Sequence, residues 1–144
     1  MSHTTTFRWS SVLALALGAL TMTSASANSA RDAERKAQVM AFAGEPVSSI
    51  RYIGTHEWEA IGDHSLLLWE TNRRAYFVDL DPTCNDLKWV MNVAVVAHGL
   101  TLDAKFDKIL VGDKTCMIQE IRPVDVKGLK AAEHEAREAR KASR

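Results

Sequence analysis

The sequence predicts a mainly β protein, an antiparallel meander folded as a sandwich or small barrel, with a short N-terminal helix and a charged C-terminal helix. Two observations predict the sheet. Between residues 48 and 122, apolar and polar side chains alternate with a period close to two, and turn-forming residues recur about every eight to twelve positions. A third observation predicts the helices, because the flanking segments 28–42 and 126–144 space their apolar residues with a helical period.

The first 27 residues have the pattern of a cleavable secretory signal peptide. Arg8 supplies the positive charge, an apolar run follows at 12–20, and Ala25 and Ala27 form the small-residue pattern that a signal peptidase reads. A run of nine apolar residues is much shorter than the roughly 20 that a permanent membrane helix needs. We therefore expect cleavage before Asn28 and a periplasmic or secreted protein with no permanent membrane span. Because no cysteine directly follows the apolar run, we also expect no lipid anchor.

The rest of the chain is predicted to form one β domain with a helix on each side. Residues 28–46 form an N-terminal helix or leader that Gly44 and Pro46 end, and its mostly alanine face leaves open a partly frayed state. Residues 47–125 form the β domain. Residues 126–144 form a solvated C-terminal helix, whose thin apolar stripe leaves open a role in docking a partner.

The alternation assigns faces to several strands. Segment 66–69 is apolar on both faces, which predicts a central strand covered on both sides. In 75–80 the even-numbered residues are expected on one face. In the last strand, strict alternation places Met117 and Ile121 on the face opposite Cys116. The full set of expected strands is 49–53, 57–61, 66–70, 75–80, 88–97, 100–105, 108–111 and 116–122.

The sequence contains two cysteines, Cys84 and Cys116. An even pair in an oxidising compartment predicts a disulfide. The alternative is a pair of free or zinc-bound thiols, but the spacing offers no CxxC or HxxxH partner motif.

The charge of the chain favours no particular partner. The sequence has 18 basic and 18 acidic residues, and removal of Arg8 with the signal peptide leaves a net charge of −1. Nucleic-acid binding needs a basic stripe to neutralise phosphates, and none is visible. We therefore expect no nucleic-acid partner.

Two histidines and three carboxylates gather around the second predicted hairpin, at positions 56, 57, 59, 63 and 64. His56 and His64 could flank this hairpin and approach a metal such as Zn²⁺, but a metal site needs three or four converging ligands. We interpret both as turn residues, with His98 as a further weak ligand candidate at a strand end. We expect no metal and no other cofactor.

No catalytic residue is assigned. The sequence has no G-x-S-x-G motif and no phosphate-binding glycine loop, and the segment from Asp79 lacks the glycine and glutamate of a calcium-binding loop.

Short motifs that belong together recur through the predicted β region: Ile50-Arg51-Tyr52, Trp58 with Ile61-Gly62-Asp63, Leu68-Trp69, Ala75-Tyr76, Asp79-Leu80, Cys84-Asn85-Asp86-Leu87, Phe106-Asp107 and the run from Cys116 to Asp125. Together they resemble domain-of-unknown-function family 6491, a group of small exported proteins of Gram-negative bacteria with no assigned activity. The resemblance covers about residues 45–130 and implies the compartment and the domain extent, but no catalytic residue. Members often look like lipoproteins, and this chain departs from them by lacking a lipidation cysteine.

These observations favour a non-enzymatic envelope protein that binds a partner protein or a small ligand. One alternative is a small hydrolase or metal-dependent enzyme that uses the His56 and His64 region. Another is a purely structural accessory factor.

Overall fold

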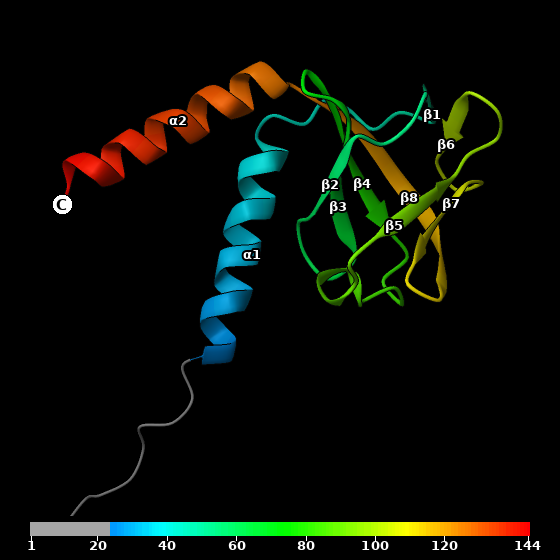
Figure 1. The fold of residues 1–144 in the computed structure, drawn as a ribbon, viewed down its shortest axis with the longest axis horizontal. Helices are drawn as coiled ribbons and strands as arrows, with labels where there is room; N and C mark the ends of the chain where they lie inside the picture. The colour runs from blue at the N-terminus through cyan, green and yellow to red at the C-terminus, as the bar shows by residue number, and fades with distance from the viewer. Residues whose placement is uncertain (1–23) are drawn as a thin grey trace, which may run out of the picture.

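The computed structural model describes residues 24–144 (Figure 1). Arg8 and the apolar run 12–20 of the predicted signal peptide lie outside the described residues. Helix α1 (Ser24–Met40) precedes the sheet, and helix α2 (Val126–Ala142) follows it. Between them lie β1 (Ser49–Arg51), β2 (Glu57–Ala60), β3 (Ser65–Thr71), β4 (Arg74–Leu80), the 3₁₀ helix η1 (Leu87–Trp89), β5 (Val93–Val96), β6 (Thr101–Asp103), β7 (Lys108–Val111) and β8 (Lys114–Val124).

The strands form one curled, six-stranded half-barrel and one two-stranded sheet. The half-barrel has the strand order β2-β3-β4-β8-β7-β5, and β1 pairs with β6 in the smaller sheet. Every pair is antiparallel. The predicted fold class, mainly β and antiparallel with a helix at each end, is confirmed.

Strands β3 and β4 are neighbouring interior strands of the half-barrel. Segment 66–68 of β3 is fully buried, as its two-sided apolar pattern predicts. In β4, Tyr76, Val78 and Leu80 point into the barrel, whereas Phe77 points to its outer face. Both face assignments from the alternation are confirmed.

Strand β8 joins the two parts of the sheet and contains a bulge. Its first part pairs with β7 and its second part with β4. A register shift between Asp79 and Leu80 of β4 leaves Gln119 of β8 without a partner of its own. After this extra residue, the side chains of β8 that strict alternation would place on one face of the sheet lie on the other face. The expectation that Ile121 lies opposite Cys116 is therefore wrong, because both side chains belong to the inner core.

The segment predicted as one strand over 88–97 is divided in the structure. The Trp89 amide donates to the Asp86 carbonyl at 2.9 Å and closes the 3₁₀ turn of η1. Leu87 of this turn is buried in the inner core, and Lys88 forms an ion pair with Asp63 at 2.9 Å. Only the end of the segment remains extended, as β5. Tertiary contacts have overridden the apolar pattern here.

Two apolar clusters lie on opposite sides of the half-barrel. The inner core fills the barrel with side chains from β3, β4, β7 and β8, including Leu68, Val78 and Ile118. The outer core lies between the sheet and the helices, where Phe77 of β4 packs with Val39 of α1 and Leu129 of α2. The sheet is thus buried on both faces over β3 and β4 and on one face elsewhere.

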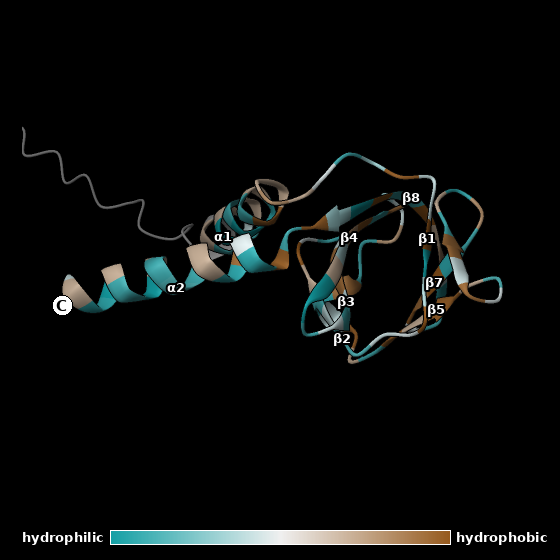
Figure 2. Ribbon diagram, turned by 90° about the horizontal axis from the view of Figure 1, so that it is seen from above, coloured by the Kyte–Doolittle hydropathy of each residue, from teal (hydrophilic) through white to brown (hydrophobic). Residues whose placement is uncertain are grey.

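The two helices leave the same end of the barrel in different directions (Figure 1). Helix α1 begins at Ser24, four residues before the predicted start, so that Ala27 and Asn28 lie inside its first turns. Helix α2 is hydrophobic where it joins the barrel and mostly hydrophilic along the rest of its length (Figure 2). Val126 and Leu129 are its buried residues, and 134–144 is exposed throughout. No helix within residues 24–144 is long and apolar enough to cross a membrane.

Candidate functional site

The structure keeps the three candidate histidines apart. His56 precedes β2, where its amide donates to the Trp69 carbonyl at 2.7 Å, and His64 lies in the turn at the opposite end of the β2–β3 hairpin. His98 lies between β5 and β6, with its Nδ1 against the Asp107 carboxylate. Among residues 24–144, no group of three or more His, Cys, Asp or Glu side chains is placed to hold a metal ion.

His64 does border a cluster that contains a serine. Ser65 Oγ donates to Asp79 Oδ1 at 2.5 Å and accepts from Lys36 Nζ at 3.0 Å, while His64 Nε2 is 3.9 Å from Asp79 Oδ1. The histidine therefore faces the aspartate and not the hydroxyl that it would have to activate. Ser65 is 1% exposed, so the hydroxyl is closed to a substrate. This cluster fixes α1 to the sheet through Lys36.

The disulfide between Cys84 and Cys116 is present in the structure. The two Cα atoms are 5.9 Å apart, within the range that a bridge requires. It ties the loop after β4 to β8, and both cysteines are buried in the inner core. The pairing predicted from the sequence is confirmed.

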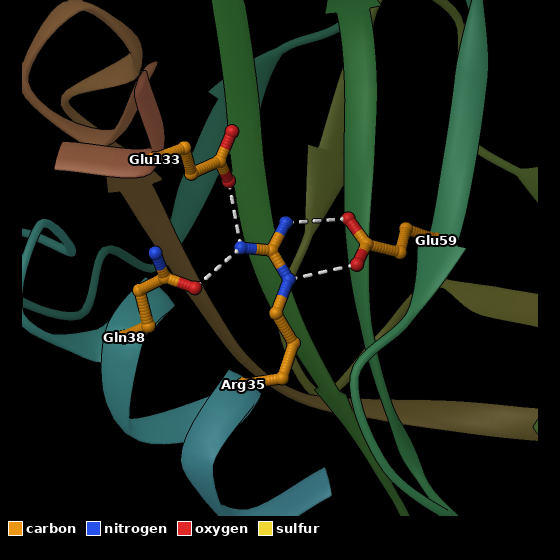
Figure 3. Close-up of polar contacts among 4 residues, drawn as sticks. All are labelled: Arg35, Gln38, Glu59 and Glu133. Carbon is orange, nitrogen blue, oxygen red and sulfur yellow. Dashed lines mark hydrogen bonds and ion pairs between the residues drawn. The ribbon is translucent and has the colours of Figure 1, made fainter. Parts of the chain in front are cut away.

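An ionic cluster centred on Arg35 connects α1, β2 and α2 (Figure 3). The guanidinium binds both carboxylate oxygens of Glu59, each at 2.8 Å, and donates from Nη1 to Glu133 of α2 at 2.7 Å. Gln38 accepts a further hydrogen bond from Nη1 at 2.9 Å. The pKa of Arg35 is raised above its ordinary value, and the hydrogen bonds to Glu59 are the largest cause. Arg35 is the one cation of this cluster, and two carboxylates match it.

A second polar cluster, around Glu70 of β3, connects the segment after β1 with β4. Glu70 has a side chain that is 1% exposed; it accepts hydrogen bonds from the Ile53 amide at 3.0 Å and from Arg74 Nη1 at 2.8 Å. Burial, followed by the charge of Glu70, raises the pKa of the Tyr76 phenol above its ordinary value. Both oxygens of this buried carboxylate are therefore satisfied within the protein, as a buried charge requires.

Two hollows open beside α2, and each is lined by three cations. The first, of about 470 Å³, lies between the β3–β4 turn and the first turns of α2 and is lined by Asn72, Arg73, Val126, Lys127 and Lys130. The second, of about 370 Å³, lies between α1 and α2 and is lined by Arg35, Gln38, Glu133, Ala136, Arg137 and Arg140. Sequence reasoning missed both hollows. The one available signal was the spacing of Lys127 and Lys130, three residues apart on a predicted helix.

The chain belongs to the DUF6491 family, a family of unknown function, whose model matches residues 6–140. The resemblance noted over about residues 45–130 is confirmed, and the matched region extends farther, through both helices. No curated protein and no solved structure matches the chain.

Proposed function

We propose that this protein is an exported, non-enzymatic envelope protein that binds an anionic partner or ligand along α2. The observation that carries the proposal is the concentration of unneutralised positive charge at this helix. Among the described residues, no ion pair involves Arg73, Lys127, Lys130, Arg137 or Arg140, and all five line the two hollows beside α2.

The charge at α2 stands out because the rest of the chain is balanced. The sequence has equal numbers of basic and acidic residues, yet the hollows beside α2 contain five unpaired cations and one carboxylate, Glu133. That carboxylate is already engaged by Arg35. Charge complementarity in such a surface speeds encounter with an anionic partner and selects against other partners.

The exposure of α2 is a second argument for a binding role. Helices in proteins gain most of their stability by packing an apolar face, and α2 packs only its first turns. Its outer part therefore offers a complete helical surface to another molecule. Exposure alone would fit a solvated helix equally well, so the proposal depends on the charges.

Export is supported by the chemistry of the chain. A disulfide is stable in an oxidising compartment and rare in the cytosol. The described side-chain contacts of α1 with the barrel begin at Asp32, which binds Lys88. Cleavage after Ala27 would therefore leave the docking of α1 intact.

The mature N-terminus provides the first test. We expect the intact mass of protein isolated from the periplasm to correspond to a chain that begins at Asn28, with two hydrogens fewer for the disulfide. Protein that retains Met1, or that is found only in the cytoplasm, would contradict export.

In-cell photo-crosslinking provides the test of binding. A photo-crosslinking amino acid at exposed position 139 of α2 should give a discrete adduct in the envelope fraction, and Arg137→Gln/Arg140→Gln should abolish it. The matched control carries the same group at position 113, in the exposed β7–β8 turn. Equal adducts at both positions, or none at 139, would refute the proposal.

A further inference from the structure

The hollow between the β3–β4 turn and α2 differs from its neighbour in having no carboxylate in its wall. Three of its five lining residues are cations, Arg73, Lys127 and Lys130, and the other two, Asn72 and Val126, are uncharged. In the hollow between α1 and α2, by contrast, Arg35 is already bound by Glu59 and Glu133. In the former, none of the lining cations forms an ion pair within the described residues, and none of the lining residues is a carboxylate.

One of the three cations is held in place. Lys130 Nζ donates to the Asn72 carbonyl at 2.8 Å and lies 5.1 Å from the centroid of the Trp69 ring. These contacts hold the ammonium at the cavity while leaving its charge uncompensated. Since an ammonium has three donors, two remain for a ligand.

The other two cations are exposed and without a described ion pair. Arg73 lies in the turn between β3 and β4, and Lys127 in the first turn of α2. The nearest carboxylates along the chain are engaged elsewhere: Asp125 accepts from the Gly128 amide at 3.1 Å, and Glu70 binds Arg74. All three cations line the same hollow, so their mutual repulsion falls when an anion enters.

We propose that this hollow binds a phosphate group, either as a free phosphate compound or as the headgroup of an anionic lipid. A phosphate offers several strong acceptor oxygens, which suit one planar guanidinium and two ammonium groups. The volume of about 470 Å³ lies within the usual range for small-molecule sites, so that a larger group attached to the phosphate can enter, with Val126 as an apolar wall. This inference rests on the proposed function and names the ligand chemistry of its surface.

The test compares purified wild-type protein with Arg73→Gln/Lys127→Gln. Calorimetric titration with inorganic phosphate, at constant ionic strength in chloride, measures the free anion. Flotation with phosphatidylglycerol vesicles, against phosphatidylcholine vesicles, measures the lipid headgroup. Lys108→Gln is the control for a lost surface charge: it removes one positive charge from an exposed position on β7, far from the hollow along the sheet. Circular dichroism and the melting temperature show that each variant is folded.

We expect the wild type and Lys108→Gln to bind inorganic phosphate, phosphatidylglycerol vesicles or both. The double variant should bind at least roughly tenfold more weakly, because each lost charge-assisted hydrogen bond changes affinity by about that factor. Phosphate binding in solution identifies a free ligand, and binding to anionic vesicles alone identifies a lipid headgroup. The proposal is overturned if the wild type binds neither, or if the double variant binds as tightly as Lys108→Gln. In that case a crosslink at position 139 would still stand as support for the proposed function.

Discussion

The inner core of the barrel and the outer layer under the helices are stabilised by different interactions. Inside the barrel, apolar side chains and the disulfide predominate, and the buried Glu70 is matched within the protein. In the outer layer, a small apolar cluster around Phe77 is surrounded by ionic contacts of Arg35 and Lys36. Salt does not weaken apolar burial, and kosmotropic salts strengthen it, whereas ion pairs near the surface are screened by salt. The comparison indicates that salt should weaken the attachment of the helices to the sheet more than it weakens the barrel itself.

Opening the disulfide should have the largest effect. Cys84 and Cys116 are 32 positions apart, so the bridge closes a loop of about 33 residues and contributes about 3.7 kcal/mol in the chain-entropy description. Cys84→Ala should lower the free energy of unfolding nearly as much as Cys84→Ala/Cys116→Ala, because either change opens the same loop. Urea denaturation measures both. A single variant that loses much less than the double variant would contradict this account.

Removing the apolar anchor of α2 should have the next largest effect. Leu129 is fully buried in the outer core, and Leu129→Ala should lower the free energy of unfolding by about 2–3 kcal/mol, the lower part of the usual range, because this layer can relax. Ala139→Ser, on the exposed part of α2, is the control and should cost no more than about 0.5 kcal/mol. Equal losses in the two variants would mean that α2 is not anchored at Leu129.

Breaking the ionic cluster should have a smaller, salt-dependent effect. Arg35→Gln should cost about 1 kcal/mol at low ionic strength and less in 1 M salt. Lys141→Gln, which removes an exposed pair with Glu138 at 2.9 Å, is the matched control and should cost less than about 0.5 kcal/mol. Denaturation of both variants at two salt concentrations tests the difference. A loss in Arg35→Gln that does not change with salt would contradict an ionic attachment of α1.

The smallest expected effect is the pH dependence of one barrel loop. Burial alone would raise the pKa of Asp107, but hydrogen bonds from the Asp103 amide and His98 outweigh it and lower the pKa below its ordinary value. A lowered folded-state pKa contributes stability above the unfolded-state pKa, about 3.9, which is lost as the pH falls through the folded-state value. Melting temperatures from pH 6 to pH 2.5 should decline less steeply for Asp107→Asn than for the wild type. Parallel declines would refute this assignment.

The sequence predicted those parts of the fold whose signal lies in a short stretch of neighbouring residues or in the cysteine content. The two-sided apolar run of β3, the alternation in β4 and the cysteine pair all had their signals in neighbouring residues or in composition. The bulge at Gln119 could not be predicted, because it arises from the pairing of β8 with β4. Likewise, η1 forms where buried Leu87 and the ion pairs of Lys88 outweigh an extended pattern.

The candidate site depended on contacts that sequence order conceals. Lys130 and Asn72 are 58 positions apart, and the fold brings them together at the hollow beside α2. His56 and His64 are close together in the sequence, yet the β2–β3 hairpin places them at its opposite ends. The balanced total charge also concealed the surplus of cations at one helix. Proximity in sequence was a poor guide to the site.

Hydrogen–deuterium exchange at low and high salt tests the difference between the two regions most directly. The account predicts that amides of β3, β4 and β8 keep the same protection at both salt concentrations, because the inner core and the backbone ladder hold them. Amides of α1 should exchange faster in 1 M salt, and those of residues 134–142 of α2 should exchange fast at both concentrations. Protection of α1 that equals that of β4 and is unaffected by salt would contradict the account.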